Sequence, residues 1–245
     1  MNKNALIVVT SNDQLGNSGQ KTGWFLSEVS HVYWPLINDG FSVDFASPQG
    51  GDAPMEKDSL KLDDPENKSF VEKFNIQNSL PTLPMKSIDP ARYQVIYFAG
   101  GHGTMWDFPD NSEIERVTSS IYENGGIVGA VCHGPSALTS VKLSDGKYLV
   151  DGKEINSFTD NEEREVEKDK IVPFLLESRL RERGGNFLAG KNWANQVVVS
   201  DRLITGQNPQ SASSLGKAIV QLFNRIEGSE SSRGRRPEGI EQRPV

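Results

Sequence analysis

Short, unbroken apolar runs constrain the fold of this chain more than any other feature. They occupy residues 4–10, 42–46, 95–99 and 127–131, and turn residues follow each of them. A continuous apolar strand is typical of a parallel sheet that is buried on both faces. Helical patterns lie between or after these runs, at 22–38, 111–123 and 173–183, each with a glycine just beyond it. The alternation predicts an α/β fold with right-handed crossovers.

Other segments predict additions to this framework. Residues 148–155 contain an Asp151-Gly152 pair between apolar residues, and residues 196–205 resemble two further short strands, so each predicts a small β-hairpin. The glycine- and proline-rich segment 47–54 predicts an excursion of the chain rather than a crossover. Apolar residues at helical spacing in 211–225 predict the closing helix.

The 245 residues fit one domain, which we place at residues 1–225. From residue 226 the composition changes to glycine, serine, proline, arginine and glutamate without apolar periodicity. Such a segment predicts a disordered tail over residues 226–245. Its arginines alternate with glutamates, which favours a solvated tail over an anion-binding segment.

Composition excludes several classes of function. Hydrophobic residues make up 36% and charged residues 24%, an ordinary globular balance. No apolar run approaches the roughly 18 residues of a membrane span, and the N-terminus lacks the apolar centre of a secretory signal. The net charge of −7 argues against nucleic acid as the main partner. We therefore expect no membrane and no nucleic-acid partner. The single cysteine allows no intramolecular disulfide, which fits a cytoplasmic location.

The densest chemical signal is IVGAVCHGPSAL, residues 127–138, where a predicted strand runs into Cys132 and His133. A strand, a tight turn and a helix in this order form a nucleophile elbow, which lifts the central side chain out of the sheet's carboxyl edge. The amides that begin the following helix are expected to lower the pKa of the thiol. A lone cysteine is by default an inert core residue. Here the turn, the adjacent histidine and the flanking glycines favour a nucleophile, with His133 as its general base.

Glu28 is the second candidate group. It lies at the edge of the apolar stripe of the predicted helix 22–38. Burial there would raise its pKa, and a protonated carboxyl could hydrogen-bond a thiolate and exchange protons with a carbonyl compound. The alternative is a surface carboxylate paired with His31.

A glycine-rich turn, YFAGGHGTMWD at residues 97–107, is the third signal. Glycines at the carboxyl end of a strand let backbone N–H groups approach an anion, so the amides of Gly101 and His133 are candidates for an oxyanion site. The spacing matches neither the dinucleotide-binding glycine pattern nor a P-loop. Three histidines and one cysteine cannot form a Cys/His-rich zinc cage, and we assign no metal site.

Six segments together resemble a known family. They lie in order between about residues 4 and 224: TGWFLSEVSHVYWPL, FASPQGG, YFAGGHGTMWDFPDN, AVCHGPSAL, SFTDNEE and TGQNPQSA. The combination resembles the PfpI-type family of the class I glutamine amidotransferase-like superfamily, and within it the glyoxalase III branch, which includes heat-inducible chaperones. The resemblance implies a flavodoxin-like three-layer α/β sandwich with a mostly parallel central sheet. It also implies a homodimer and a cofactor-independent conversion of methylglyoxal to D-lactate.

The resemblance also implies roles for individual residues. The nucleophile falls on Cys132, its neighbour on His133 and the family's helix glutamate on Glu28. The triad acid follows a Phe-Thr pair and falls on Glu163, with Glu162 as the alternative because the two glutamates are adjacent.

The same likeness places the substrate pocket near Trp24, Gly101 and His102, and more loosely near residues 208–210. Classical glutamine amidotransferases carry a triad histidine far downstream of the cysteine. No histidine follows His133, so glutaminase chemistry is not expected.

The leading hypothesis is therefore a glyoxalase III-type enzyme that acts on small 2-oxoaldehydes without glutathione, through a hemithioacetal on Cys132. One alternative is a protein deglycase or another Cys-His-Glu hydrolase, which would use the same thiolate. Two others belong to different classes: a stress-induced holdase chaperone that binds unfolded client proteins, and a redox-sensing thiol protein.

Overall fold

The four apolar runs of the sequence become neighbouring parallel strands in the computed structural model, which describes residues 3–233. These strands are β1 (Asn4–Val8), β2 (Ser42–Ser47), β5 (Val95–Phe98) and β6 (Ile127–Val131). A fifth parallel strand, β10 (Leu203–Gly206), pairs with β6. The order of these five within the sheet is β2-β1-β5-β6-β10, the order of flavodoxin-like folds. The predicted fold class is confirmed.

Short strands complete both edges of the sheet. On one side β9 (Val197–Ser200) pairs antiparallel with β10, which confirms the predicted hairpin at 196–205. On the other side β4 (Ser79–Pro84) lies parallel to β2, and β3 (Gly51–Pro54) lies antiparallel to β4. Segment 47–54 was predicted only as an excursion of the chain. Prolines in β3 and β4 weaken the strand pattern, and proline is tolerated mainly at sheet edges.

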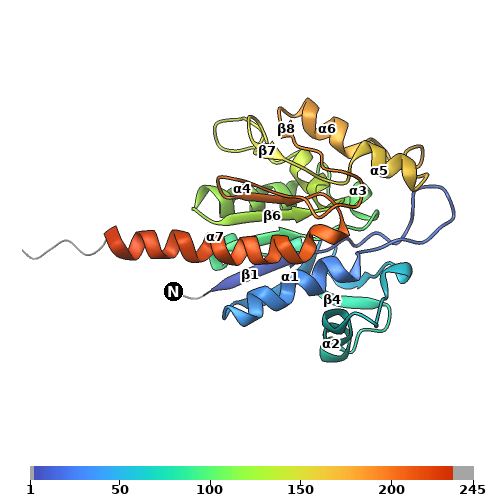
Figure 1. The fold of residues 1–245 in the computed structure, drawn as a ribbon, viewed down its shortest axis with the longest axis horizontal. Helices are drawn as coiled ribbons and strands as arrows, with labels where there is room; N and C mark the ends of the chain where they lie inside the picture. Colours follow the sequence, from blue (N-terminus) through green and yellow to red (C-terminus); the bar gives the residue numbers. More distant parts are fainter. Residues whose placement is uncertain (1–2, 234–245) are drawn as a thin grey trace, which may run out of the picture.

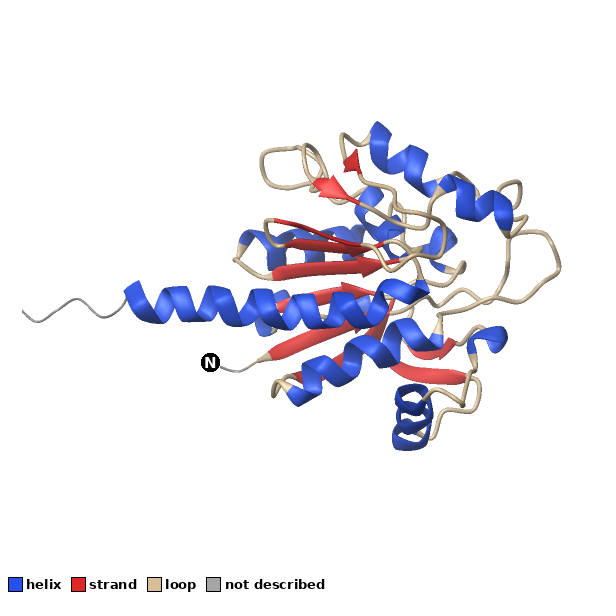
Figure 2. Cartoon of the chain, in the orientation of Figure 1, coloured by secondary structure: helices blue, strands red, loops and turns tan. Residues whose placement is uncertain are grey.

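Alternate side chains of the strands supply two cores, one on each face of the sheet. Ala5, Ile7 and Val9 face one core, which is covered by α1 (Leu26–Asn38), α2 (Pro65–Phe74) and α7 (Ala212–Arg233). Leu6 and Val8 face the other, which is covered by α4 (Ser112–Glu123) and α6 (Leu176–Glu182). In Figure 1, α1 and α7 run side by side across the sheet. Figure 2 shows the strands enclosed between helices, which gives the expected three layers.

Helix boundaries follow the predicted ranges with local differences. α4 has Asn111 as its N-cap, as the pattern at 111–123 predicts. The helices predicted at 22–38 and 173–183 begin later, at Leu26 and Leu176. None of the helices within residues 3–233 combines the length and the apolar character that a bilayer span requires.

The hairpin predicted at residues 148–155 is wrong. Asp151 and Gly152 do form a turn, in which the N–H of Gly152 donates to the carbonyl of Gly184. The strand that follows, β7 (Glu154–Ile155), pairs in parallel with the distant β8 (Asn186–Phe187). This pairing places Ile155 in the same core as Phe187. The Asp151-Gly152 pair therefore predicts the turn correctly, but it does not show which strand pairs with β7.

The end of the closing helix also differs from the prediction. α7 continues past residue 225 to Arg233, so residues 226–233 are helical rather than disordered. Ile226 still packs against the core, and Glu, Ser and Arg are tolerated in helices, so Gly228 alone does not end it. Figure 1 shows this end of α7 extending beyond the sheet. The disorder predicted for residues 234–245 lies outside the described residues.

A close backbone approach fixes the turn after β6. A Cβ atom on Gly134 would lie 2.2 Å from the carbonyl oxygen of Phe98, at the end of β5. We expect Gly134→Ala to lower the free energy of unfolding by roughly 1–3 kcal/mol, because the backbones of β5 and the turn must separate. Urea denaturation measures the change.

Gly228→Ala is the control for this substitution. Its Cβ would meet nothing within 4 Å, and alanine favours the helix, so stability should stay the same or rise by up to about 1 kcal/mol. Equal effects of the two substitutions would contradict the proposed crowding at Gly134.

Candidate active site

The turn after β6 holds Cys132 in a backbone conformation that non-glycine residues rarely adopt. Its φ is +58°, in the left-handed region, and the 3₁₀ helix η4 (Gly134–Thr139) follows. The N–H of Cys132 donates to the carbonyl of Gly206, and its carbonyl accepts from the N–H of Phe158. Bonds to two other segments thus hold the strained residue in place. This strand, tight turn and helix form the predicted nucleophile elbow.

The imidazole of His133 lies between Cys132 and Glu163. Its Nδ1 is 3.3 Å from the Cys132 sulfur, and its Nε2 is 2.6 Å from Oε2 of Glu163. A carboxylate accepts hydrogen bonds, so it fixes the proton of neutral His133 on Nε2. Nδ1 is then left with a lone pair directed toward the thiol. This arrangement lets His133 take the proton of Cys132.

The two adjacent glutamates of α5 (Asp160–Glu165) have different partners. Glu163 contacts the imidazole, whereas Glu162 forms a capping box with Thr159 at the start of the helix. Glu162 also accepts hydrogen bonds from the backbone N–H of Trp193 and from the side-chain amides of Gln207 and Asn208. Of the two alternatives left by the sequence, Glu163 is the one placed against His133.

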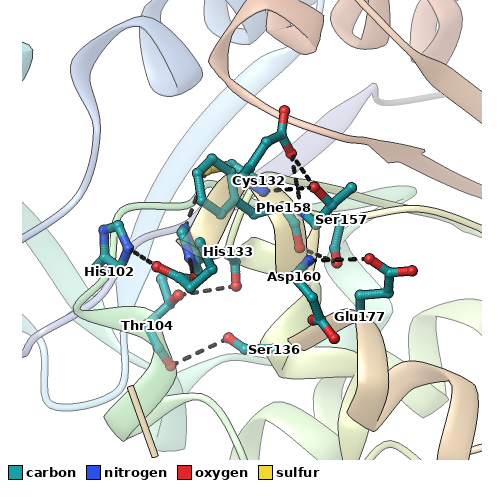
Figure 3. Close-up of polar contacts among 12 residues, drawn as sticks. His102, Thr104, Cys132, His133, Ser136, Ser157, Phe158, Asp160 and Glu177 are labelled. Atoms are coloured by element: carbon teal, nitrogen blue, oxygen red, sulfur yellow. Dashed lines mark hydrogen bonds and ion pairs between the residues drawn. The ribbon is translucent and has the colours of Figure 1, made fainter. Parts of the chain in front are cut away.

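A second histidine shares this carboxylate. Nε2 of His102 lies 2.6 Å from Oε1 of Glu163, and the rings of His102 and His133 are 4.0 Å apart. The two imidazoles, which are labelled in Figure 3, therefore bond different oxygens of one carboxylate. Burial and the neighbouring His133 lower the pKa of His102 to about 3. Burial would raise the pKa of Glu163, but the two imidazoles outweigh it and hold that pKa well below its usual range.

Glu28 is fully buried on α1, on the other side of Cys132. Its Oε2 accepts a hydrogen bond from the N–H of Gly100 at 2.6 Å. Burial raises the pKa of Glu28 to about 8, against the lowering effect of the Gly100 N–H. The carboxyl is therefore mostly protonated at neutral pH, as expected. The alternative pairing with His31 is wrong, because His31 contacts Asp64 at 2.9 Å.

The expected low pKa of the Cys132 thiol is not found. Burial raises the pKa of Cys132 well above its usual value, and the nearby Glu28 raises it further. The following 3₁₀ helix has only six residues, so its dipole is too small to offset this desolvation. The resting group is therefore a neutral thiol.

Two backbone amides are free beside the thiol. The N–H groups of Gly101 and His133 donate to no other residue within 3–233, and both residues line the cavity that Cys132 faces. Gly101 has a φ of +105°, and a Cβ there would lie 2.0 Å from the carbonyl oxygen of Gly23. The Thr104 hydroxyl lies 3.0 Å from the carbonyl oxygens of Gly101 and His133 and links the two turns. Figure 3 shows Thr104 beside His133. The pair has the form of an oxyanion site.

A cavity of about 550 Å³ opens above these groups. Its apolar wall comes from Phe25, Phe158, Val166 and Trp193, and its polar lining includes His31, Glu56, Lys61, Asp63, Asp64, Lys168 and Gln210. Gly101 and His102 line the cavity as predicted, and so does Gln210 from the more loosely expected segment 208–210. Most of the other residues come from segments whose meeting depends on the tertiary fold, so local sequence gave no signal for them.

Two expected pocket residues lie elsewhere. Trp24 is fully buried, and its indole N–H donates to the carbonyl of Ala53, so its side chain belongs to the core. α1 begins two residues later, and the adjacent Phe25 faces the cavity instead. Asn208 is also buried, and its amide donates to Glu162. It supports α5 rather than lining the pocket.

One group of described residues has spacing suited to a metal ion. The candidate ligand atoms of His102, His133 and Glu163 lie within 4.8 Å of one another. Both oxygens of Glu163 already accept short hydrogen bonds from the two imidazoles. Hydrogen bonding therefore accounts for the cluster, and an ion would have to replace both bonds.

Comparisons with known proteins agree with this architecture. The model of the DJ-1/PfpI family matches residues 26–222. A glutathione-independent glyoxalase of Saccharomyces cerevisiae is 34% identical over 91% of this chain and 99% of its own length. Glyoxalase 3 of Candida albicans is 29% identical over 89% of this chain and 97% of its own.

Solved structures give the same result. The 24-kDa rapid encystment protein of Francisella tularensis superposes with a TM-score of 0.85 and 39% identity, over 90% of this chain and 99% of that chain. The glyoxalase III structure from Candida albicans gives a TM-score of 0.80 and 26% identity, over 90% and 97% of the two chains. The family match covers most of the chain, and the relatives match it nearly end to end. The chain belongs to the DJ-1/PfpI family.

Proposed function

We propose that this protein is a glutathione-independent glyoxalase that converts methylglyoxal to D-lactate. The observation that carries the proposal is a cluster of a thiol, an imidazole and a protonated carboxyl. Cys132 and His133 line the cavity, and the buried carboxyl of Glu28 lies beside the thiol. An internal rearrangement of a 2-oxoaldehyde needs a nucleophile for the aldehyde carbon and groups that move a proton between adjacent carbons. The glyoxalase names of the fungal relatives support the same reaction.

The first step joins the substrate to the enzyme. Nδ1 of His133 takes the thiol proton while the sulfur of Cys132 attacks the aldehyde carbon. The aldehyde oxygen gains negative charge, which the N–H groups of Gly101 and His133 stabilise. Protonation of that oxygen by His133 or Glu28 gives a neutral hemithioacetal. Glu163 holds the imidazole in the required tautomer and stabilises its cationic form.

The second step moves hydrogen within the substrate. A base removes the proton from the former aldehyde carbon while the neighbouring ketone oxygen gains a proton, which gives an enediol. Protonation of the former ketone carbon, with loss of the hydroxyl proton from the carbon that carries the sulfur, leaves a lactoyl thioester on Cys132. His133 and Glu28 are the two groups that we assign to these proton transfers. Water then hydrolyses the thioester, which releases lactate and restores the thiol.

The other activities considered remain predictions. A deglycase or hydrolase would use the same thiol, and no contact in the site favours those reactions over the rearrangement. A holdase role, a homodimer, a cytoplasmic location and a redox-sensing role of Cys132 likewise stay predictions.

The first test removes the nucleophile. Cys132→Ser should lower D-lactate formation from methylglyoxal by roughly a thousandfold or more, because a serine hydroxyl is a far weaker nucleophile than a thiolate. The assay is run without glutathione, and thermal unfolding checks that the variant is folded. A folded variant with unchanged turnover would disprove the covalent mechanism.

Adjacent glutamates offer a matched pair of variants. Glu163→Gln should lower kcat by roughly a hundredfold or more, since the imidazolium loses its charged partner. Glu162→Gln should lower thermal stability instead, because Glu162 accepts several buried hydrogen bonds away from the thiol. Steady-state kinetics and thermal unfolding of both variants separate the roles. A larger loss of kcat in Glu162→Gln would reverse the assignment.

The pH dependence should report Glu28. Its raised pKa of about 8 means that the protonated carboxyl is present at neutral pH and is lost as the pH rises through that value. If this proton is used in the first step, kcat/KM falls above about pH 8. The apparent pKa of this fall belongs to the coupled groups of the site rather than to Glu28 alone. Glu28→Gln cannot ionise, so the limb assigned to Glu28 should disappear along with most of the activity. A variant that keeps full activity and an unchanged profile would rule out proton transfer by Glu28.

A further inference from the structure

Glu163 is bonded to two imidazoles, although one histidine is enough for a Cys-His-Glu triad. Both contacts are 2.6 Å long, and they use different carboxylate oxygens. His102 comes from the turn after β5, His133 from the elbow after β6 and Glu163 from α5. All three side chains are buried, so water competes little for these hydrogen bonds. The role of His102 in this arrangement is separate from nucleophilic attack and needs its own explanation.

The two histidines compete for the negative charge of Glu163. Each N–H donor stabilises the negative charge of Glu163. A carboxylate that already accepts one such bond attracts a neighbouring imidazolium less strongly. The N–H of His102 therefore weakens the effect by which Glu163 favours the protonated form of His133.

Burial and the neighbouring side chains keep His102 neutral, so that it remains a hydrogen-bond donor to Glu163. Burial, His133 and Lys168 all oppose protonation of His102, and its pKa of about 3 leaves the ring neutral at ordinary pH. Its Nε2 proton is then fixed by Glu163. The other titratable groups near the cluster are Cys132 beside His133, Glu28 beyond the thiol and Glu162 on α5. None of these three donates to Glu163 in the described structure, so they do not replace His102.

We propose that His102 is a positioning residue, which holds one oxygen of Glu163 and so limits the basicity of His133. The inference rests on the proposed function in one respect, the use of His133 to take and return a proton. A base that is too strong would keep the thiol proton as a stable imidazolium and return it slowly to the substrate. A moderated base can do both within one turnover.

Two substitutions separate the hydrogen bond from the ring. His102→Phe keeps a planar ring against His133 but removes the N–H donor. His102→Gln removes the ring but places an amide N–H near the position of Nε2. If the hydrogen bond limits the basicity of His133, the two variants should differ in that basicity. If only ring packing matters, His102→Phe should resemble the wild-type protein.

The direct measurement is the pKa of His133 by ¹⁵N NMR of the imidazole nitrogens. The chain has three histidines, which makes the spectrum assignable. A Cys132→Ser background removes the thiol, so that its titration does not mix with that of the imidazole. In this background we expect His102→Phe to raise the pKa of His133 by roughly one unit and His102→Gln to change it by less than half as much. An unchanged or lower pKa in the Phe variant, or an equal shift in both variants, overturns the proposal.

A second measurement uses the intact thiol. A more basic His133 holds more of the pair as thiolate and imidazolium, so iodoacetamide should alkylate Cys132 up to roughly tenfold faster at pH 7 in His102→Phe. The rate should stay near the wild-type value in His102→Gln, and equal rates in both variants count against the proposal. If the Phe variant does not fold, His102→Leu removes the donor with a smaller side chain and should show the same two changes.

Neither measurement depends on turnover. If the wild-type protein forms no D-lactate but His102→Phe shifts the pKa of His133 as predicted, the proposed function is refuted and the role of His102 stands. If the wild-type protein forms D-lactate but His102→Phe leaves the pKa of His133 unchanged, the role of His102 is refuted and the proposed function stands.

Discussion

Removal of water from around Cys132 controls the chemistry of the whole site. Burial raises the pKa of the thiol and of Glu28, and it lowers the pKa of His102. Each of these groups is therefore neutral at rest. Glu163 in contrast keeps its charge, because two imidazole N–H groups compensate for its burial. The site thus holds one negative charge beside His133 and a proton on Glu28. In the proposed mechanism, the thiolate and the imidazolium form together only when the thiol proton moves.

The sheet makes this concentration of groups possible. Parallel strands bring their carboxyl ends to one edge, where the turns after β5 and β6 meet. Glycines at both turns allow backbone contacts that a side chain would block, as at Gly101 and Gly134. Glu28 enters from α1 and Glu163 from α5, so the site depends on four separate segments. A small displacement of any one of them would change the distances on which proton transfer depends.

Local sequence patterns predicted the features that have local causes. Buried strands need unbroken apolar runs, and the elbow needs a small-residue turn after a strand, so both were visible in the sequence. The burial of Glu28 followed from its place on the apolar stripe of α1. Contacts between distant segments were not visible: the pairing of β7 with β8, the burial of Trp24 and the choice between Glu162 and Glu163. The predicted low pKa of the Cys132 thiol was wrong. The amides of the following helix can be identified from the sequence, whereas desolvation of the thiol depends on the folded surroundings.

The left-handed backbone of Cys132 has a wider meaning. Glycine adopts this conformation without the steric penalty that a side chain brings. A side chain at this position adds a conformational cost that glycine would not have, whereas its burial in the core acts in the opposite direction. In the proposed mechanism, the residue that supplies the nucleophile is therefore also the one that carries the backbone strain of the turn.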